Sequence, residues 1–217
     1  GFESLKNLSS GAGNVAVGYQ AGLEHTSGNY NTIMGYQAAA AFDAGEDNNV
    51  VIGYQAGLSL DNGGVNDNVI IGYTAGTGGA TGLSDCVVIG SDAMNSTGSS
   101  ALPSGTVAIG KSALTTLTSG TQNLAIGYQA GMTLEGSDNN TVIGHSAGKL
   151  MSNNAGNTVV GALAFDAEDS GGSDNVVIGF GAAGALNSTA ADSNVIIGSE
   201  SGIAGAIGSN AAFTGNI

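Results

Sequence analysis

One phrase recurs from one end of the chain to the other: an asparagine, three small apolar residues, a glycine and, three residues later, an alanine. It occurs as NVAVGYQAG at 14–22, NVVIGYQAG at 49–57 and NLAIGYQAG at 123–131. Self-similarity at a short period indicates a solenoid, in which each coil packs mainly on its neighbours. We call the glycine after the apolar triplet the anchor glycine. The anchors are Gly18, Gly35, Gly53, Gly72, Gly90, Gly110, Gly127, Gly144, Gly161, Gly179 and Gly198.

The spacing of the anchors limits the kind of coil that the chain can form. Gly18 and Gly35 are 17 residues apart, whereas Gly90 and Gly110 are 20 apart, and the other steps lie between these values. This period suits two short strands and two turns per coil. Insertions occur only before the asparagine, where they would form loops on one edge. The sequence therefore predicts an all-β, parallel β-solenoid of about eleven coils, continuous over residues 1–217.

The apolar triplet is expected to be a strand that is buried on both faces. Residues three and one before the anchor, such as Val50 and Ile52, share one face, which we expect to be the core. The residue between them points the other way, yet it is never polar. We expect neighbouring chains to cover that second face, so that the pattern predicts an oligomer. Val51→Asp or Ile70→Asp should then prevent assembly.

Two further positions are nearly constant. Asparagine stands four residues before the anchor, except where Cys86 and Thr106 replace it. Asparagine tolerates left-handed backbone, and stacked asparagines can bond to one another, so we expect a structural ladder; a ligand-binding row of amides is the alternative. Three residues after the anchor is alanine, with Ser201 as the exception. Alanine there and glycine at the anchor indicate a close approach of backbone layers, or a positive φ at the glycine.

The charge of the chain excludes several classes of partner. The formal net charge is −14, and only Lys6, Lys111 and Lys149 are positive. Nothing in the sequence could neutralise a row of phosphates, so we expect no nucleic-acid partner. The sequence holds no run of about eighteen apolar residues, so we also expect no membrane insertion.

The polar residues offer no recognisable catalytic set. Acidic residues gather before the asparagines, as in Glu46-Asp47, and we expect a solvated acidic edge; weak calcium binding is the alternative. His25 falls in a predicted loop and His145 replaces a tyrosine, and neither has a partner for a triad or a metal set. Cys86 is expected to be a small buried residue. We therefore expect no enzymatic activity and no cofactor.

A row of aromatic and amide side chains follows the anchors and is the candidate binding surface. Spaced one coil apart, such rungs could stack on sugar rings and bond their hydroxyls. The alternative is that the tyrosines form a purely structural ladder. The candidate residues are Tyr19, Gln20, Tyr36, Gln37, Tyr54, Gln55, Tyr73, Tyr128 and Gln129.

Both ends of the chain lie inside repeats. Gly1 stands 17 residues before Gly18, at an anchor position. Near the other end, Ala206-Ile207-Gly208 with Ala211 forms a compact version of the motif. We expect this chain to be a segment of a longer repeat array.

The repeat resembles two known families. Residues 13–21 and 106–113 resemble the head repeats of trimeric autotransporter adhesins, and the Asn-x-x-Ile-Gly-Tyr-Gln-Ala-Gly form resembles repeats of bacteriophage tail fibres. The resemblance implies a left-handed β-roll, a homotrimer and an extracellular place on a virion or a bacterial surface, with a glycan or protein receptor. We expect a segment of a tail fibre that acts as a rigid spacer. An adhesin head and an end-to-end extracellular filament are the alternatives; an ice-binding solenoid is disfavoured because no regular Thr-x-Thr face is present.

Overall fold

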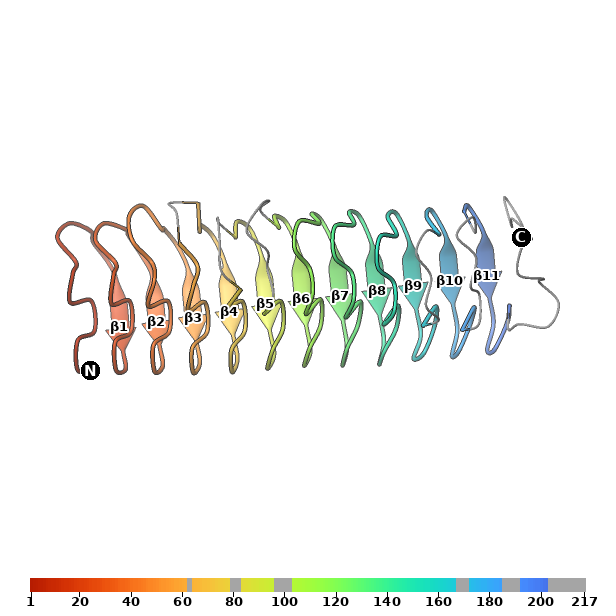
Figure 1. The fold of residues 1–217 in the computed structure, drawn as a ribbon, viewed down its shortest axis with the longest axis horizontal. Helices are drawn as coiled ribbons and strands as arrows, with labels where there is room; N and C mark the ends of the chain where they lie inside the picture. Colours follow the sequence, from red (N-terminus) through yellow and green to blue (C-terminus); the bar gives the residue numbers. More distant parts are fainter. Residues whose placement is uncertain (62–63, 79–82, 96–102, 167–171, 185–191, 203–217) are drawn as a thin grey trace.

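The computed structural model describes residues 1–61, 64–78, 83–95, 103–166, 172–184 and 192–202. These residues form a parallel β-solenoid with one three-residue strand in each repeat (Figure 1). The strands are β1 (Val15–Val17), β2 (Thr32–Met34), β3 (Val50–Ile52), β4 (Val69–Ile71), β5 (Val87–Ile89), β6 (Val107–Ile109), β7 (Leu124–Ile126), β8 (Thr141–Ile143), β9 (Thr158–Val160), β10 (Val176–Ile178) and β11 (Val195–Ile197).

The strands follow one another in sequence order and keep the repeat in register. Val50 pairs with Thr32 on one side and with Val69 on the other, so each repeat position forms a column along the sheet. This arrangement confirms the predicted fold class. The expectation of two strands per coil was too high: beside the strands, the described residues show only isolated bridges, such as Ser27 with Ala44 and Asn66 with Ser84. None of the described residues forms a helix that could cross a membrane.

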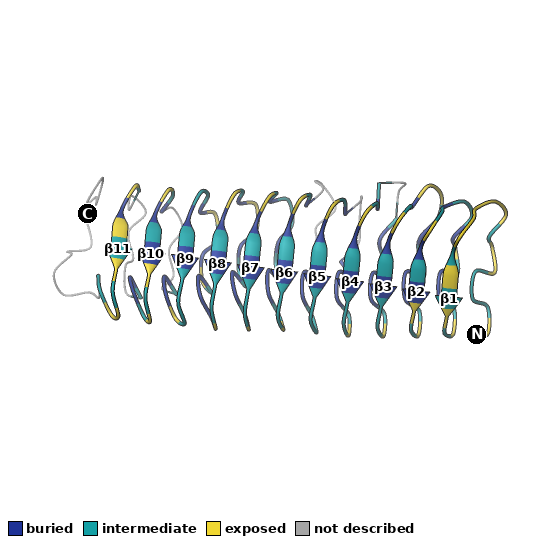
Figure 2. Ribbon diagram, turned by 180° about the vertical axis from the view of Figure 1, so that it is seen from behind, coloured by how far each residue is buried: buried dark blue, intermediate teal, exposed yellow. Residues whose placement is uncertain are grey.

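The structure reverses the predicted orientation of the strands. The middle residue of each triplet points into the chain's own interior, where Val51 and Ile70 are fully buried. The residues on either side point outward and are half-buried or exposed; in β1, for example, Val15 and Val17 are each 51% exposed. Figure 2 shows this outer stripe along the strands, with the most exposed residues at β1 and β11. The interior of a thin coil has room for one side chain per strand, and the middle residue fills it.

Val51→Asp is therefore expected to unfold the chain itself, not to separate assembled chains. A carboxylate at this position would lie in an apolar core without a partner, which destabilises by several kcal/mol. Ile52→Asp is the matched control, because the side chain next along the strand points outward. Circular dichroism should show the β signal lost for Val51→Asp and kept for Ile52→Asp. Equal retention in both variants would contradict the assignment of the inner face.

The core consists of parallel columns of mostly apolar side chains. One column holds the middle strand residues, and a second holds the alanines three residues after the anchors, all fully buried at the described positions before Ser201. A third column lies seven residues after the anchor and carries larger side chains. Its described members include His25, Phe42, Leu60, Leu117, Leu134 and Met151. The alanine column confirms that only a small side chain is accommodated there.

The anchor glycines meet both conditions predicted for them. At Gly53, φ is +141°, and a Cβ atom would lie 2.2 Å from the carbonyl oxygen of Gly72 in the next coil. Gly1 occupies the same column, because a Cβ atom on it would lie 2.2 Å from the carbonyl oxygen of Gly18. The anchor motif predicted at 206–211 lies outside the described residues.

Candidate functional site

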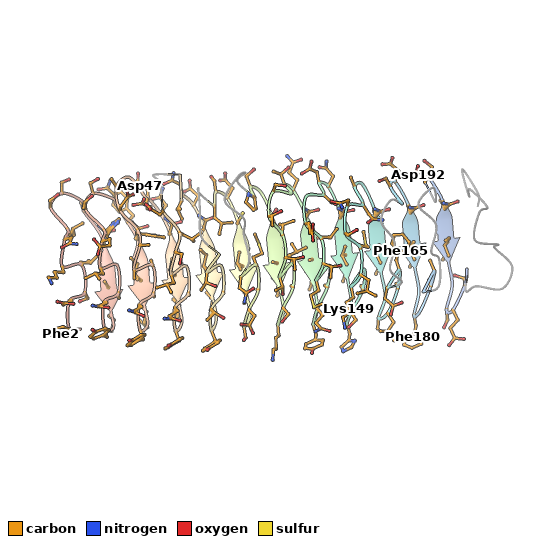
Figure 3. The ribbon with its side chains drawn as sticks, in the orientation of Figure 1. Phe2, Asp47, Lys149, Phe165, Phe180 and Asp192 are labelled. Atoms are coloured by element: carbon orange, nitrogen blue, oxygen red, sulfur yellow. The ribbon has the colours of Figure 1, made fainter. Side chains whose placement is uncertain are left out.

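The tyrosines that follow the anchors stack into one aromatic ladder at an edge of the solenoid. We call the rings of Phe2, Tyr19, Tyr36, Tyr54 and Tyr73 the aromatic ladder. The ring centroids of Tyr19 and Tyr36 are 5.1 Å apart, and those of Tyr54 and Tyr73 are 5.2 Å apart, with nearly parallel planes. The four tyrosines are 40–56% exposed. Figure 3 places Phe2, and Phe180 at the equivalent position of β10's coil, along the same edge.

The glutamines form a second ladder beside the aromatic one. The Nε2 atom of Gln55 donates to Oε1 of Gln37 at 3.0 Å, and Nε2 of Gln37 donates to Oε1 of Gln20 at 3.0 Å. The Gln20 amide donates in turn to Glu3 at 2.8 Å. All three glutamines adopt a left-handed backbone with φ near +52°. Their amides are thus engaged in holding adjacent coils, which also fixes the spacing of the rings beside them.

Not every predicted site residue belongs to this ladder. Ser91 and Lys111 stand at the aromatic position in the next two coils, so Tyr128 is separated from Tyr73. Tyr128 stacks instead on His145, with ring centroids 5.1 Å apart. Gln129 has serines at the equivalent position of both neighbouring coils, Ser112 and Ser146. The structure therefore gathers seven of the nine predicted residues into one unit and places the other two further along the same edge.

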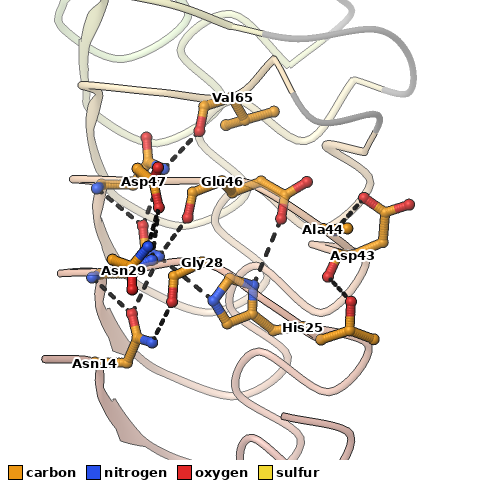
Figure 4. Close-up of polar contacts among 12 residues, drawn as sticks. Asn14, His25, Gly28, Asn29, Asp43, Ala44, Glu46, Asp47 and Val65 are labelled. Atoms are coloured by element: carbon orange, nitrogen blue, oxygen red, sulfur yellow. Dashed lines mark hydrogen bonds and ion pairs between the residues drawn. The ribbon is translucent and has the colours of Figure 1, made fainter. Parts of the chain in front are cut away.

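The asparagine ladder has the structural role that the sequence predicted. Oδ1 of Asn31 accepts hydrogen bonds from the backbone N–H of Asn49 at 2.9 Å and from its Nδ2 at 3.0 Å. Nδ2 of Asn49 also donates to the carbonyl oxygen of Val65 at 2.6 Å. Each buried amide thereby joins its own coil to both neighbours, and Figure 4 shows the first of these rungs near Asn14. Both polar ends of the side chain are used inside the fold.

Several loop carboxylates also bind backbone. The N–H of Asn29 donates to Oδ1 of Asp47 at 2.6 Å, and the N–H of Thr121 donates to Oδ1 of Asp138 at 2.6 Å. These aspartates occupy the position six residues before the anchor and bond to the preceding coil. Within the described part of the chain, no group of three or more His, Cys, Asp or Glu side chains is placed to hold a metal ion. Weak calcium binding stays the untested alternative.

A buried histidine and glutamate form a polar contact that the sequence reasoning missed. His25 and Glu46 are both fully buried, and Nδ1 of His25 lies 3.5 Å from Oε2 of Glu46 (Figure 4). Nε2 of His25 lies 3.4 Å from Nδ2 of Asn31. His25 lies in a loop, as predicted, but its contact with Glu46 was not anticipated, and the assignment of Glu46 to the solvated edge was wrong because the side chain is fully buried. Glu46 also contacts the carboxylate of Asp43, whose pKa is lowered chiefly by the backbone N–H of Ala44.

Cys86 is buried in place of a ladder asparagine, as predicted. Its Sγ atom lies 3.2 Å from the carbonyl oxygens of Ser84 and of Pro103, and burial raises the pKa of the thiol to about 11. A thiol that stays protonated at neutral pH is a poor nucleophile.

Two exposed surfaces among the described residues are therefore available for recognition. One is the row of tyrosine side chains in the aromatic ladder, and the other is the apolar stripe on the outer face of the strands. Comparison with protein-family models, with characterised proteins and with solved structures gives no match, so the geometry alone bears on function.

Proposed function

We propose that this chain is a segment of an extracellular homotrimeric fibre of the tail-fibre kind, which gives rigid reach and presents its edge to a host surface. The observation that carries the proposal is the outer stripe of the sheet. Two outward side chains on each of eleven strands make 22 residues, and apart from threonines such as Thr32 all are apolar. No charged residue lies in any of these strands. An apolar surface of this length is typical of an interaction site.

A second copy of the same chain is the partner that fits this stripe best. A partner must offer apolar side chains along the whole solenoid, and another copy has the same repeat and the same strand spacing. Stable interfaces contain about 20–30 residues on each side, and the 22 outward residues fall within that range. Figure 3 places Asp47 and Asp192 along the opposite edge from Phe2, before the start of their strands, so neither carboxylate lies in the outer stripe.

The resemblance of the repeats favours three copies around a closed axis. A bacterial adhesin head would use the same stripe in the same way. The native mass measured by light scattering after size-exclusion chromatography tests the proposal. Three times the chain mass of 20.9 kDa is the expected result, and a monomer at micromolar concentration would contradict the fibre.

Charges placed on the stripe are expected to dissociate the trimer without unfolding it. Ile109→Glu with Ile126→Glu puts two carboxylates on the outward side of β6 and β7, where both native side chains are half-buried. The matched control is Gln122→Glu with Asn139→Asp, two nearly isosteric changes at exposed positions that add the same charge. Light scattering should give the monomer mass for the first variant and the trimer mass for the control, with β circular dichroism kept in both. A trimer in both variants would show that the interface lies elsewhere.

A further inference from the structure

We propose that the aromatic ladder binds an extended, uncharged polysaccharide of β-1,4-linked six-membered sugars, with one sugar on each coil. The inference deepens the adhesive part of the proposed function, but it rests on residues of a single chain. Its basis is the match between two repeats. Consecutive tyrosine centroids are 5.1, 5.2 and 5.2 Å apart. An extended β-1,4-linked chain advances by nearly the same distance per sugar. Successive sugars would therefore lie beside successive tyrosines over several coils.

The exposed part of each ring selects the chemistry of the ligand. The planes of Tyr36 and Tyr54 are within 8° of parallel, and each ring covers the face of the next. Sugars therefore cannot stack on the inner rings, contrary to the mode of binding expected from the sequence. The ladder presents ring edges and phenol hydroxyls, and ring edges carry the positive end of the quadrupole. Oxygen-rich groups suit such a surface, as do the equatorial hydroxyls that line both sides of a β-1,4-linked chain.

The surroundings of the ladder fix the charge and the length of the ligand. The chain carries a net charge of −14, and the carboxylate of Glu3 lies at one end of the glutamine ladder, so polysaccharides with acidic sugars would be repelled. The run of phenols begins at Tyr19, next to Phe2, and ends at Tyr73, because Ser91 follows in the next coil. Four phenols in register define a site for about four sugars.

The rungs are rigid before any ligand arrives. The backbone N–H of Gln37 donates to the carbonyl oxygen of Tyr19, and that of Gln55 to Tyr36, each at 2.8 Å. Together with the amide bonds between the glutamines, these contacts hold the four hydroxyls in a fixed row. A preformed site loses little conformational entropy on binding, which favours a linear ligand over a flexible one.

Titration calorimetry with defined oligosaccharides tests the inference. Affinity for β-1,4-linked glucose oligomers should rise from the disaccharide to the tetrasaccharide and then level off. Maltotetraose, the α-1,4-linked isomer of cellotetraose, curves away from a straight row and should bind at least tenfold more weakly. Equal binding of cellotetraose and maltotetraose, or no binding of either cellotetraose or the β-1,4-linked tetramer of N-acetylglucosamine, would overturn the proposal.

Two conservative variants separate the hydroxyl row from the fold. Tyr36→Phe with Tyr54→Phe keeps the stacked rings and removes two hydroxyls, and it should weaken binding of cellotetraose on the order of tenfold. Tyr30→Phe is the control, because Tyr30 is an exposed tyrosine that packs over Gly13 outside the ladder, and it should leave affinity unchanged. Equal losses in both variants would overturn the assignment of the ladder. The native mass decides the fibre proposal separately: a trimer that binds no oligosaccharide refutes only the ladder site.

Discussion

Gly53→Ala, like alanine at most of the other anchor glycines, is expected to disrupt the solenoid strongly although it adds only one methyl group. A Cβ atom at this position would lie 2.2 Å from the carbonyl oxygen of Gly72 and 2.7 Å from its carbonyl carbon, and neither is a flexible side chain. The φ of +141° adds strain for any residue with a Cβ atom. We expect a loss of about 4 kcal/mol or more, a large part of the stability of an ordinary domain. Urea unfolding followed by circular dichroism measures it.

Gly45→Ala separates the clash from the backbone strain. Gly45 also has a positive φ, +88°, but a Cβ atom there would meet nothing within 4 Å. This variant should lose only about 1–2 kcal/mol, the cost of an unfavourable φ alone. If both variants lost the same stability, the contact between anchor glycines would not be what excludes larger residues.

Single substitutions of the buried pair of His25 and Glu46 are also expected to destabilise the chain strongly. His25→Leu removes the imidazole that contacts the buried Glu46 side chain. Glu46→Val removes the carboxyl group that contacts the buried His25 ring. Breaking a buried polar pair from one side destabilises by about 3–5 kcal/mol. The native imidazole also fits closely, because a Cβ atom on Gly28 would lie 2.4 Å from its Cε1 atom.

The double variant His25→Leu with Glu46→Val should restore most of that loss. It places at each position a residue that a later coil carries there: Leu60 stands two coils after His25 and Val65 one coil after Glu46, and both are fully buried. Replacing a buried pair by apolar residues of similar size is commonly neutral or stabilising. The urea midpoint of the double variant should therefore lie near that of the unmodified chain. A double variant as unstable as the two single variants combined would show that the residues are not coupled.

The fold could be predicted from the repeat because each conserved position of the repeat meets a local requirement of the backbone. The anchor glycine and the ladder asparagine each occupy a position where one kind of residue satisfies the backbone, so their recurrence could be interpreted without coordinates. The stacked tyrosines followed from the same spacing. The exposure of their edges did not, because it depends on how each ring is turned against the next.

The orientation of the strands could not be deduced from the alternation of apolar residues, because both faces are apolar. Two weaker signals were present. Ala16, Ala108 and Ala125 show that small residues recur at the middle position, which suits a narrow interior. Threonine occurs only at the first position, as in Thr141 and Thr158, which suits a surface that water or a partner contacts.

The buried pair was missed because its members belong to different repeats and to different columns. His25 stands in the column of Phe42 and Leu60, and Glu46 stands in the column of Val65. A polar residue in each of two apolar columns, in adjacent coils, was the available signal. Finding it requires the columns to be aligned before any single residue is interpreted.

The interruptions of the asparagine and tyrosine ladders coincide in the same two coils, so fewer side-chain contacts join the coils there and we expect the rod to be less stiff at this point. Cys86 and Thr106 replace the ladder asparagines there, and Ser91 and Lys111 replace the tyrosines. Thr106 makes a longer bond to the backbone of Asn123, at 3.4 Å, than the asparagines make elsewhere. Under tension or bending, strain would concentrate at β5 and β6, leaving a stiff arm on either side.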